Sequence, residues 1–159
     1  MATPVDILAL RESVVAEART WLKTKFHHQA RKKGVGVDCA MLSLEVGREA
    51  GVFPVDVRTF RKVTQRYGRH PDPERMRAAF LELGAVEITA AEATIGDVAW
   101  MHWGNLMPIH TAIIADIDGR ASLIHAIWND EVREHGFDDN WRKLVFSYWR
   151  YPGIAEALA

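Results

Sequence analysis

The chain has 159 residues and 48% of them are hydrophobic, which suits one domain with one sizeable core. Its formal net charge is -1, so overall electrostatics draw it neither to nucleic acid nor to a membrane surface. Its single cysteine, Cys39, excludes an internal disulfide. The start of the sequence has no basic segment followed by a long apolar stretch, so we expect neither a signal peptide nor a membrane span.

The first half of the chain has apolar residues at helical spacing. Asp38 is a suitable N-cap for a helix that begins at Cys39, and Gly51 stands where such a helix would end. Asp72 has the same capping role before a proline, and Gly84 ends the helix that follows. The helices expected from these patterns cover residues 5–24, 39–50, 54–67 and 73–83, with a turn-like stretch before Asp38.

The second half of the chain changes to short stretches rich in β-forming residues. Asp118-Gly119 is a hairpin turn signal between the third and fourth of them. Helices followed by a strand meander predict an α+β fold with an antiparallel sheet, in one domain over residues 1–159. The expected strands are 85–88, 97–103, 110–116, 122–128, 131–134 and 144–150.

Cys39 follows a loop of small residues, 34–37, and begins the helix capped by Asp38. Backbone N–H groups and the helix dipole at such a position favour the thiolate, the form of cysteine that acts as a nucleophile. Residues 18–37 include no acidic residue, and the positive charge of this stretch would favour the thiolate and attract substrate carboxylates. The alternative is a buried structural thiol beside a solvated loop. The basic residues of this run are Arg19, Lys23, Lys25, Arg31, Lys32 and Lys33.

Two histidines lie in apolar, strand-like surroundings downstream of Cys39. His110 would accept the thiol proton and return it to the leaving amine. His125 lies near-diagonal to it across the predicted hairpin, where a second imidazole can hold the first in orientation. Together the three residues suggest a nucleophile, its base and an orienting partner. The alternative for either histidine is a hydrogen-bonded core residue.

The other histidines and tryptophans carry weaker signals. His27 and His28 precede the nucleophile loop and either line the site or lie exposed, and Trp103 is core or part of a groove wall. We expect His70 and His135 at the surface. The spacings typical of zinc sites, of phosphate-binding glycine loops and of nucleic-acid-binding faces are absent from the sequence, so no metal, cofactor or nucleic-acid partner is expected.

The Asp38-Cys39 pair, followed by two strand histidines, resembles the NlpC-type cell-wall cysteine peptidases, in particular their phage-tail branch. The likeness covers most of the chain outside about residues 53–93. It implies a papain-like α+β fold with the cysteine helix packed on an antiparallel sheet. The matching segments are 18–22, 27–29, 34–39, 96–98, 108–113, 123–126, 132–134, Trp141 and 148–152.

The resemblance implies cleavage of peptidoglycan stem peptides, commonly at the amide between D-γ-glutamate and diaminopimelate. Cys39 matches the nucleophile, His110 the base and His125 the polar third member. The branch implies phage tail proteins as partners: the protein would be made in the cytoplasm and delivered by a tail to the periplasm or cell wall, without membrane insertion. The residues expected to contact substrate are Phe26, His27, His28, Asp38 and Trp103.

The sequence departs from the family pattern at one single residue and at one pair of residues. A tyrosine whose hydroxyl stabilises the oxyanion is usual where this chain has Phe26, and losing one such donor costs about 10²–10³ in rate. The backbone N–H of Cys39 remains, and His27 or His28 can substitute. The usual Ser-Gly pair after the cysteine is Ala40-Met41. These departures keep two alternatives open: a tail-tip structural protein with little activity, and a papain-like acyl-transfer enzyme acting on another amide or thioester.

Overall fold

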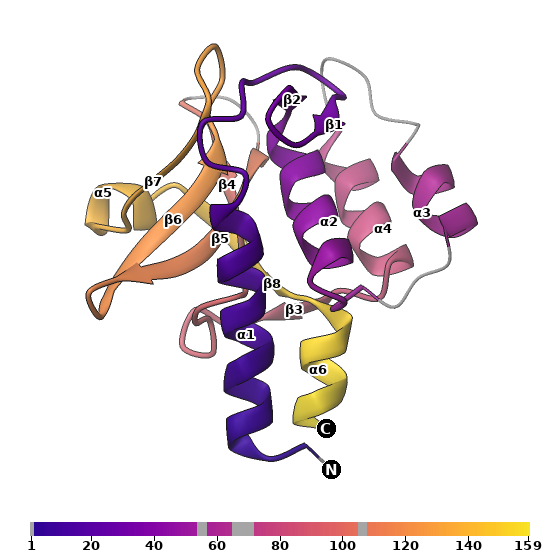
Figure 1. The fold of residues 1–159 in the computed structure, drawn as a ribbon, viewed down its shortest axis with the longest axis vertical. Coiled ribbons are helices and arrows are strands. Elements are labelled where there is room, and N and C mark those ends of the chain that lie inside the picture. The colour runs from indigo at the N-terminus through magenta and orange to yellow at the C-terminus, as the bar shows by residue number, and fades with distance from the viewer. Residues whose placement is uncertain (1, 54–56, 65–71, 105–107) are drawn as a thin grey trace.

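A computed structural model describes residues 2–53, 57–64, 72–104 and 108–159 (Figure 1). Its helices are α1 (Pro4–Arg19), α2 (Cys39–Glu49), α3 (Val57–Thr64), α4 (Pro73–Glu82), α5 (Asp139–Arg142) and α6 (Pro152–Leu158). Two short strands, β1 (Arg31–Lys32) and β2 (Gly36–Val37), pair with each other. The remaining strands are β3 (Val86–Ile88), β4 (Val98–His102), β5 (Pro108–Ile117), β6 (Arg120–Ala126), β7 (Val132–Gly136) and β8 (Val145–Arg150).

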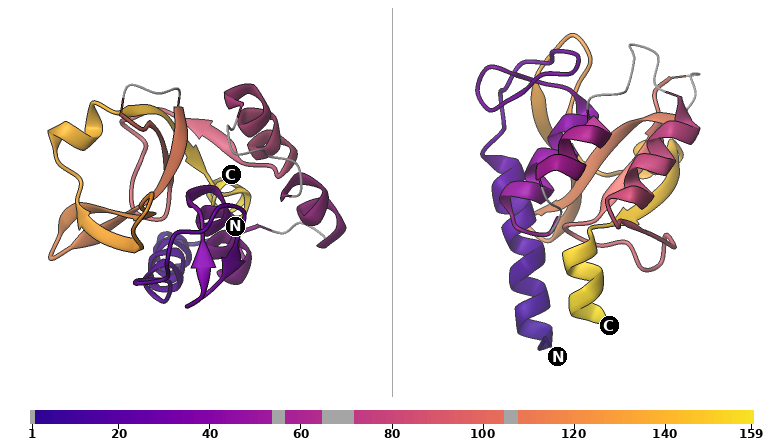
Figure 2. Two further views of the ribbon diagram at one scale, coloured as in Figure 1. Left: turned by 90° about the horizontal axis from the view of Figure 1, so that it is seen from above. Right: turned by 90° about the vertical axis from the view of Figure 1, so that its right-hand side faces the viewer.

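The larger sheet has six strands in the order β3-β8-β4-β5-β6-β7, and every neighbouring pair is antiparallel. α1, α2 and α4 lie against its central strand β5, and α6 runs beside α1 at the end of the molecule where both termini lie (Figures 1 and 2). The predicted α+β arrangement with an antiparallel sheet is confirmed.

The helix that carries Cys39 forms as its local signals predict. The Asp38 carboxylate accepts a hydrogen bond from the backbone N–H of Met41, and Gly51 adopts a φ of 72° just past the helix. The first helix ends at Arg19, short of the predicted 24, because the backbone turns there. Lys23 has a φ of 68°, and its N–H donates to the carbonyl of Val132 instead of continuing the helix.

The β5–β6 hairpin turns where the sequence predicts. Asp118 and Gly119 have φ values of 52° and 76°, as a two-residue turn with two left-handed positions requires. Ile113 pairs with Ile124 in this register. Because side chains alternate along a strand, His110 and His125 project from the same face of the sheet. Of the predicted helix 54–67, α3 confirms 57–64, and the remainder lies outside the described residues.

A buried ion cluster joins α1 to the start of β4 and to β8. The Asp97 side chain is fully buried, and its carboxylate lies 3.1 Å from Arg11 Nη1 and 3.0 Å from Arg150 Nε. Both guanidinium groups are themselves nearly buried, at 7% and 11% exposure. The single negative charge of the carboxylate is therefore shared between two cations that the surrounding protein shields from water.

Candidate active site

Asp38 fixes the position at which α2 begins. One carboxylate oxygen accepts from Met41 N in the first turn of the helix at 2.9 Å, and the other accepts from Gln29 N at 2.6 Å. The residue is 3% exposed. These are the contacts of a helix cap that also ties the preceding loop to the helix, and they hold Cys39 in place. Its predicted contact with substrate stays a prediction.

Cys39 lies against β5, beside the residues that flank His110. Its Sγ donates to the carbonyl of Ile109 at 3.7 Å, and Thr111 Oγ1 donates to the carbonyl of Cys39 at 2.8 Å. Ser43, one turn along α2, contacts the same threonine hydroxyl at 3.0 Å. The thiol of α2 and the backbone around His110 are thus brought together by segments far apart in the sequence. Among the hydrogen bonds of the described residues, none joins the thiol to the His110 ring.

His110 and His125 contact each other as the hairpin register predicts. His110 Nε2 and His125 Nδ1 are 2.7 Å apart, and the residues are 5% and 0% exposed. The bond restrains the rotation of the His110 ring. The orienting role of His125 in catalysis stays a prediction. The Asp118-Gly119 turn sets the strand register that pairs these two residues.

His135 was expected at the surface, and the structure corrects this. It lies on β7, half-buried, with its Nε2 2.7 Å from His125 Nε2 and its Nδ1 2.9 Å from the carbonyl oxygen of Gly136. Alternation along β7 is the one sequence signal that could have found it, because it sets His135 on the face opposite to Glu134. The other predicted surface histidine, His70, lies outside the described residues.

Two tryptophans cover the three histidine rings. The Trp103 ring centroid is 4.6 Å from that of His110, tilted by 42°. Trp141, from α5, lies 5.2 Å from His125 edge-on and 4.5 Å from His135. His110 and His125 are buried beneath this cover, at 5% and 0% exposure, which limits the access of water to their rings. Trp103 therefore borders the site, and its predicted contact with substrate stays a prediction.

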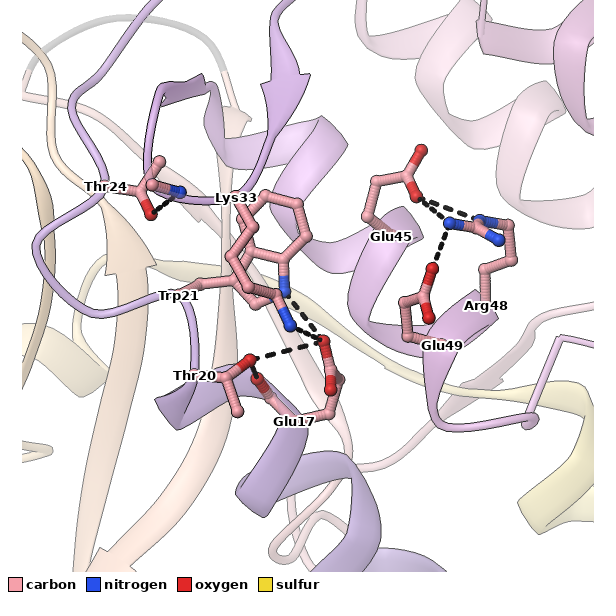
Figure 3. A network of polar contacts seen from close by, with 9 residues as sticks. Glu17, Thr20, Trp21, Thr24, Lys33, Glu45, Arg48 and Glu49 are labelled. Atoms are coloured by element: carbon pink, nitrogen blue, oxygen red, sulfur yellow. Dashed lines mark hydrogen bonds and ion pairs between the residues drawn. The ribbon is translucent and has the colours of Figure 1, made fainter.

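The basic run before Cys39 is largely neutralised by acids from other parts of the chain. Lys33 Nζ lies 2.7 Å from Glu17 of α1, which also accepts from Trp21 Nε1 (Figure 3). In the same view, Arg48 on α2 forms ion pairs with Glu45 and with Glu49. The expected positive rim is thus much weaker than the sequence predicts. The other pairs of the run are Arg19 with Glu134, Lys25 with Glu131 and Arg31 with Glu45.

The Cys39 thiol is harder to ionise than the sequence predicts. Burial, and secondly the nearby charge of Asp38, raise its pKa to about 12, against a smaller lowering by the backbone N–H groups of Thr111, Ala40 and Cys39 itself. Burial lowers the pKa of His110 to about 3. The resting pair is therefore a neutral thiol and a neutral imidazole. Such a pair reacts by transferring the proton as the sulfur attacks, with the imidazole as general base.

The buried histidines make stability depend on pH. Burial first, and then the neighbouring His110 and His135, lower the pKa of His125 to about 2, while an unfolded histidine has a pKa of about 6.5. At a pH below about 6.5, the histidines of the unfolded chain bind protons, whereas the buried rings of the folded chain stay neutral. The free energy of unfolding should therefore fall as the pH drops from 7 to 5, by up to about 1.4 kcal/mol per unit for each of His110 and His125.

Urea unfolding at pH 7, 6 and 5 measures this dependence, with His110→Gln as the control variant. The variant removes one of the two groups and should show the smaller slope. Equal free energies of unfolding at pH 7 and pH 5 in the native sequence would contradict the assignment of two buried neutral rings.

The remaining predicted substrate residues lie in the segment before β1. The Phe26 ring packs on that of Trp128, with centroids 5.1 Å apart. Phenylalanine has no hydroxyl to donate where the resemblance implies a tyrosine. His27 packs on Gly36, where a Cβ would come within 2.6 Å of its ring. His28 Nδ1 lies 3.7 Å from an oxygen of Asp38. Their substrate contacts stay predictions.

In the part of the chain that the structure describes, no cluster of three or more histidine, cysteine, aspartate or glutamate side chains is arranged to bind a metal ion. The helices there are also too short or too polar to cross a bilayer.

The comparison with known proteins concerns the fold. No protein-family model matches the chain, and no curated protein matches it in sequence. A solved structure from Staphylococcus aureus, described as similar to lipoprotein, NLP/P60 family, has 16% identity and a TM-score of 0.58. It is matched over 90% of this chain and 41% of its own, so the chain spans about two fifths of that protein. The chain has the fold of the NLP/P60 proteins.

A second structure agrees. The NlpC/p60 domain of the peptidoglycan hydrolase SagA has 21% identity and a TM-score of 0.52, over 88% of this chain and 97% of that domain. The predicted papain-like α+β fold, with the cysteine helix packed on an antiparallel sheet, is confirmed. Neither neighbour is described as a phage-tail protein, so that branch stays a prediction.

Proposed function

We propose that this protein is a cysteine peptidase that hydrolyses amide bonds in the stem peptides of peptidoglycan. The observation that carries the proposal is the placement of Cys39 at the start of α2, where its thiol donates a hydrogen bond to the carbonyl of Ile109, the residue before His110, while His110 is hydrogen-bonded to His125. The NlpC/P60 fold supports it, since one structural neighbour is described as a peptidoglycan hydrolase.

In the first half of the reaction Cys39 Sγ attacks the scissile carbonyl carbon while its proton moves to the free nitrogen of His110. The backbone N–H at the start of α2 donates to the oxyanion that forms. The carbon–nitrogen bond then breaks, and His110 gives the proton to the leaving amine. The product is a thioester between Cys39 and the new carboxyl end of the peptide.

In the second half a water molecule attacks the thioester and gives a proton to His110. The carbon–sulfur bond breaks, and the proton returns to the sulfur. His125 keeps the His110 ring in one orientation through both halves. The neutral resting pair fits this sequence, because each half needs a free imidazole nitrogen.

The finer proposal is that the bond is the D-γ-glutamyl-diaminopimelate amide and that the protein acts as part of a phage or prophage tail. It rests on the likeness of the segments around Asp38-Cys39, His110 and His125 to the phage-tail branch. Tail proteins would then be its partners, and it would be made in the cytoplasm and act in the periplasm or cell wall.

The test incubates the purified protein with soluble stem peptides that carry diaminopimelate or lysine, and measures the fragments by mass spectrometry. We expect cleavage by the native sequence and none by Cys39→Ala. The fragment masses identify the bond. Equal cleavage by the variant would contradict the proposal.

A second candidate is a tail component with the peptidase fold and little activity. Phe26 in place of a hydroxyl donor and the raised pKa of the Cys39 thiol favour it. It predicts no cleavage by either protein, circular dichroism spectra of a folded chain in both, and stable association with tail proteins.

A further inference from the structure

Three histidine rings form one continuous chain of hydrogen bonds across β5, β6 and β7. His110 Nε2 lies 2.7 Å from His125 Nδ1, and His125 Nε2 lies 2.7 Å from His135 Nε2. His135 Nδ1 then lies 2.9 Å from the carbonyl oxygen of Gly136. This series of hydrogen bonds begins at His110, the proposed base, and ends at the backbone carbonyl of Gly136.

The last bond sets the direction of all the others. A carbonyl oxygen only accepts, so His135 Nδ1 carries a proton, and the neutral ring then has a lone pair on Nε2. His125 must donate to that lone pair from its Nε2, which leaves its Nδ1 as an acceptor. His110 must in turn donate from Nε2. Three neutral rings hold three N–H protons, and the three bonds use all of them.

Three of the six ring nitrogens carry no proton, and His110 Nδ1 is the one of them that accepts no hydrogen bond within this chain. The lone pairs of His125 Nδ1 and His135 Nε2 are both engaged as acceptors. A proton arriving from a thiol therefore has one vacant acceptor among these six ring nitrogens. His110 and His125 are 5% and 0% exposed, and Trp141 packs on the rings of His125 and His135, so water has little access to the nitrogens that join His110 to His125.

We propose that His135 is a positioning residue that, anchored by the Gly136 carbonyl, fixes the tautomer of His110 with the proton on Nε2 and a free lone pair on Nδ1. The role rests on the proposed function, in which Nδ1 takes the proton of Cys39. His135 does not touch the reacting atoms. It acts through His125, two hydrogen bonds away.

The first experiment reads the tautomers directly. Two-dimensional nitrogen-15 NMR of the histidine rings at pH 7 distinguishes protonated from unprotonated ring nitrogens. We expect protons on His110 Nε2, His125 Nε2 and His135 Nδ1, and none on His110 Nδ1. A proton on His110 Nδ1 in the native sequence would overturn the proposal, and the measurement needs neither substrate nor a variant.

The second experiment replaces His135, the last ring in this series of hydrogen bonds. His135→Phe keeps an aromatic ring beside Trp141 but removes the acceptor for His125, so both directions of the chain become accessible. We expect a protonated fraction at His110 Nδ1, and a fall of about fivefold in kcat with KM unchanged, as the loss of one net hydrogen bond implies. His135→Glu supplies an oxygen that only accepts and should restore the tautomer and at least half of kcat.

The outcomes separate this inference from the function on which it rests. An unchanged His110 tautomer in His135→Phe would overturn the positioning role, whatever the activity. The expected tautomers in a protein that cleaves no stem peptide would support the hydrogen-bond chain and contradict the proposed function instead. A fall in kcat that His135→Glu does not reverse would show a structural effect and would also overturn the positioning role.

Discussion

His110→Ala is expected to lower kcat/KM for stem-peptide hydrolysis on the order of 10³-fold. The thiol of Cys39 has its pKa raised to about 12 by burial and by Asp38, so almost none of it is thiolate at neutral pH. Attack therefore depends on a base that removes the proton in the transition state. Without the imidazole, no group in its place accepts that proton or gives one to the leaving amine.

Steady-state kinetics on the fragments of one stem peptide measure the effect. The matched control is His102→Ala on the neighbouring strand β4, where the ring packs edge-on against Phe146. We expect that variant to stay within about twofold of the native rate. If His110→Ala kept more than a tenth of kcat/KM, His110 would not be the base.

Asp97→Ala is expected to cost about 3–5 kcal/mol of the free energy of unfolding. The carboxylate is fully buried between Arg11 and Arg150, whose side chains are 7% and 11% exposed. Removing it leaves two cations in a low-dielectric setting with their counter-charge gone. This is a larger penalty than the pair itself contributes, because the charges stay behind without compensation.

Urea unfolding followed by circular dichroism measures this cost. Glu87→Ala is the control, because it breaks a carboxylate–guanidinium pair with Arg77 in which the two side chains are 40% and 43% exposed. Such pairs contribute about 0–1 kcal/mol. Asp97→Asn keeps the shape and removes only the charge, and should lose stability in the same direction. A loss below about 1 kcal/mol in both Asp97 variants would contradict the account of the cluster.

The features that the sequence predicts well are those with local causes. The Asp38 cap and the glycine after α2 place Cys39 at a helix start, and the Asp118-Gly119 turn alone sets the register that brings His110 to His125. These signals act within a few residues and need no knowledge of the rest of the fold.

The features that the sequence missed depend on contacts between distant segments. His135 joins the site because β7 pairs with β6 and because Trp141, from a four-residue helix, covers it. The basic run reads as a positive rim, yet Glu17 and Glu131 reach its lysines from elsewhere in the chain. No local sequence pattern predicts these contacts between distant segments.

The thiol shows how the balance of effects changes with packing. A helix start favours the thiolate by about 0.3–1 kcal/mol when it is exposed. Burial of the sulfur against β5 acts in the opposite direction and is larger, and the Asp38 cap that forms the helix adds a negative charge beside it. The same residue therefore positions Cys39 and opposes its ionisation.

Capture of an acyl group on Cys39 tests the central claim most directly. An ester analogue of the stem peptide should acylate a cysteine peptidase faster than water removes the acyl group, so the intermediate accumulates. After an acid quench and peptic digestion, mass spectrometry should find the acyl group on the peptide that contains Cys39, and at a much lower level in His110→Ala. Hydrolysis of the ester with no acyl group on Cys39 would contradict the account.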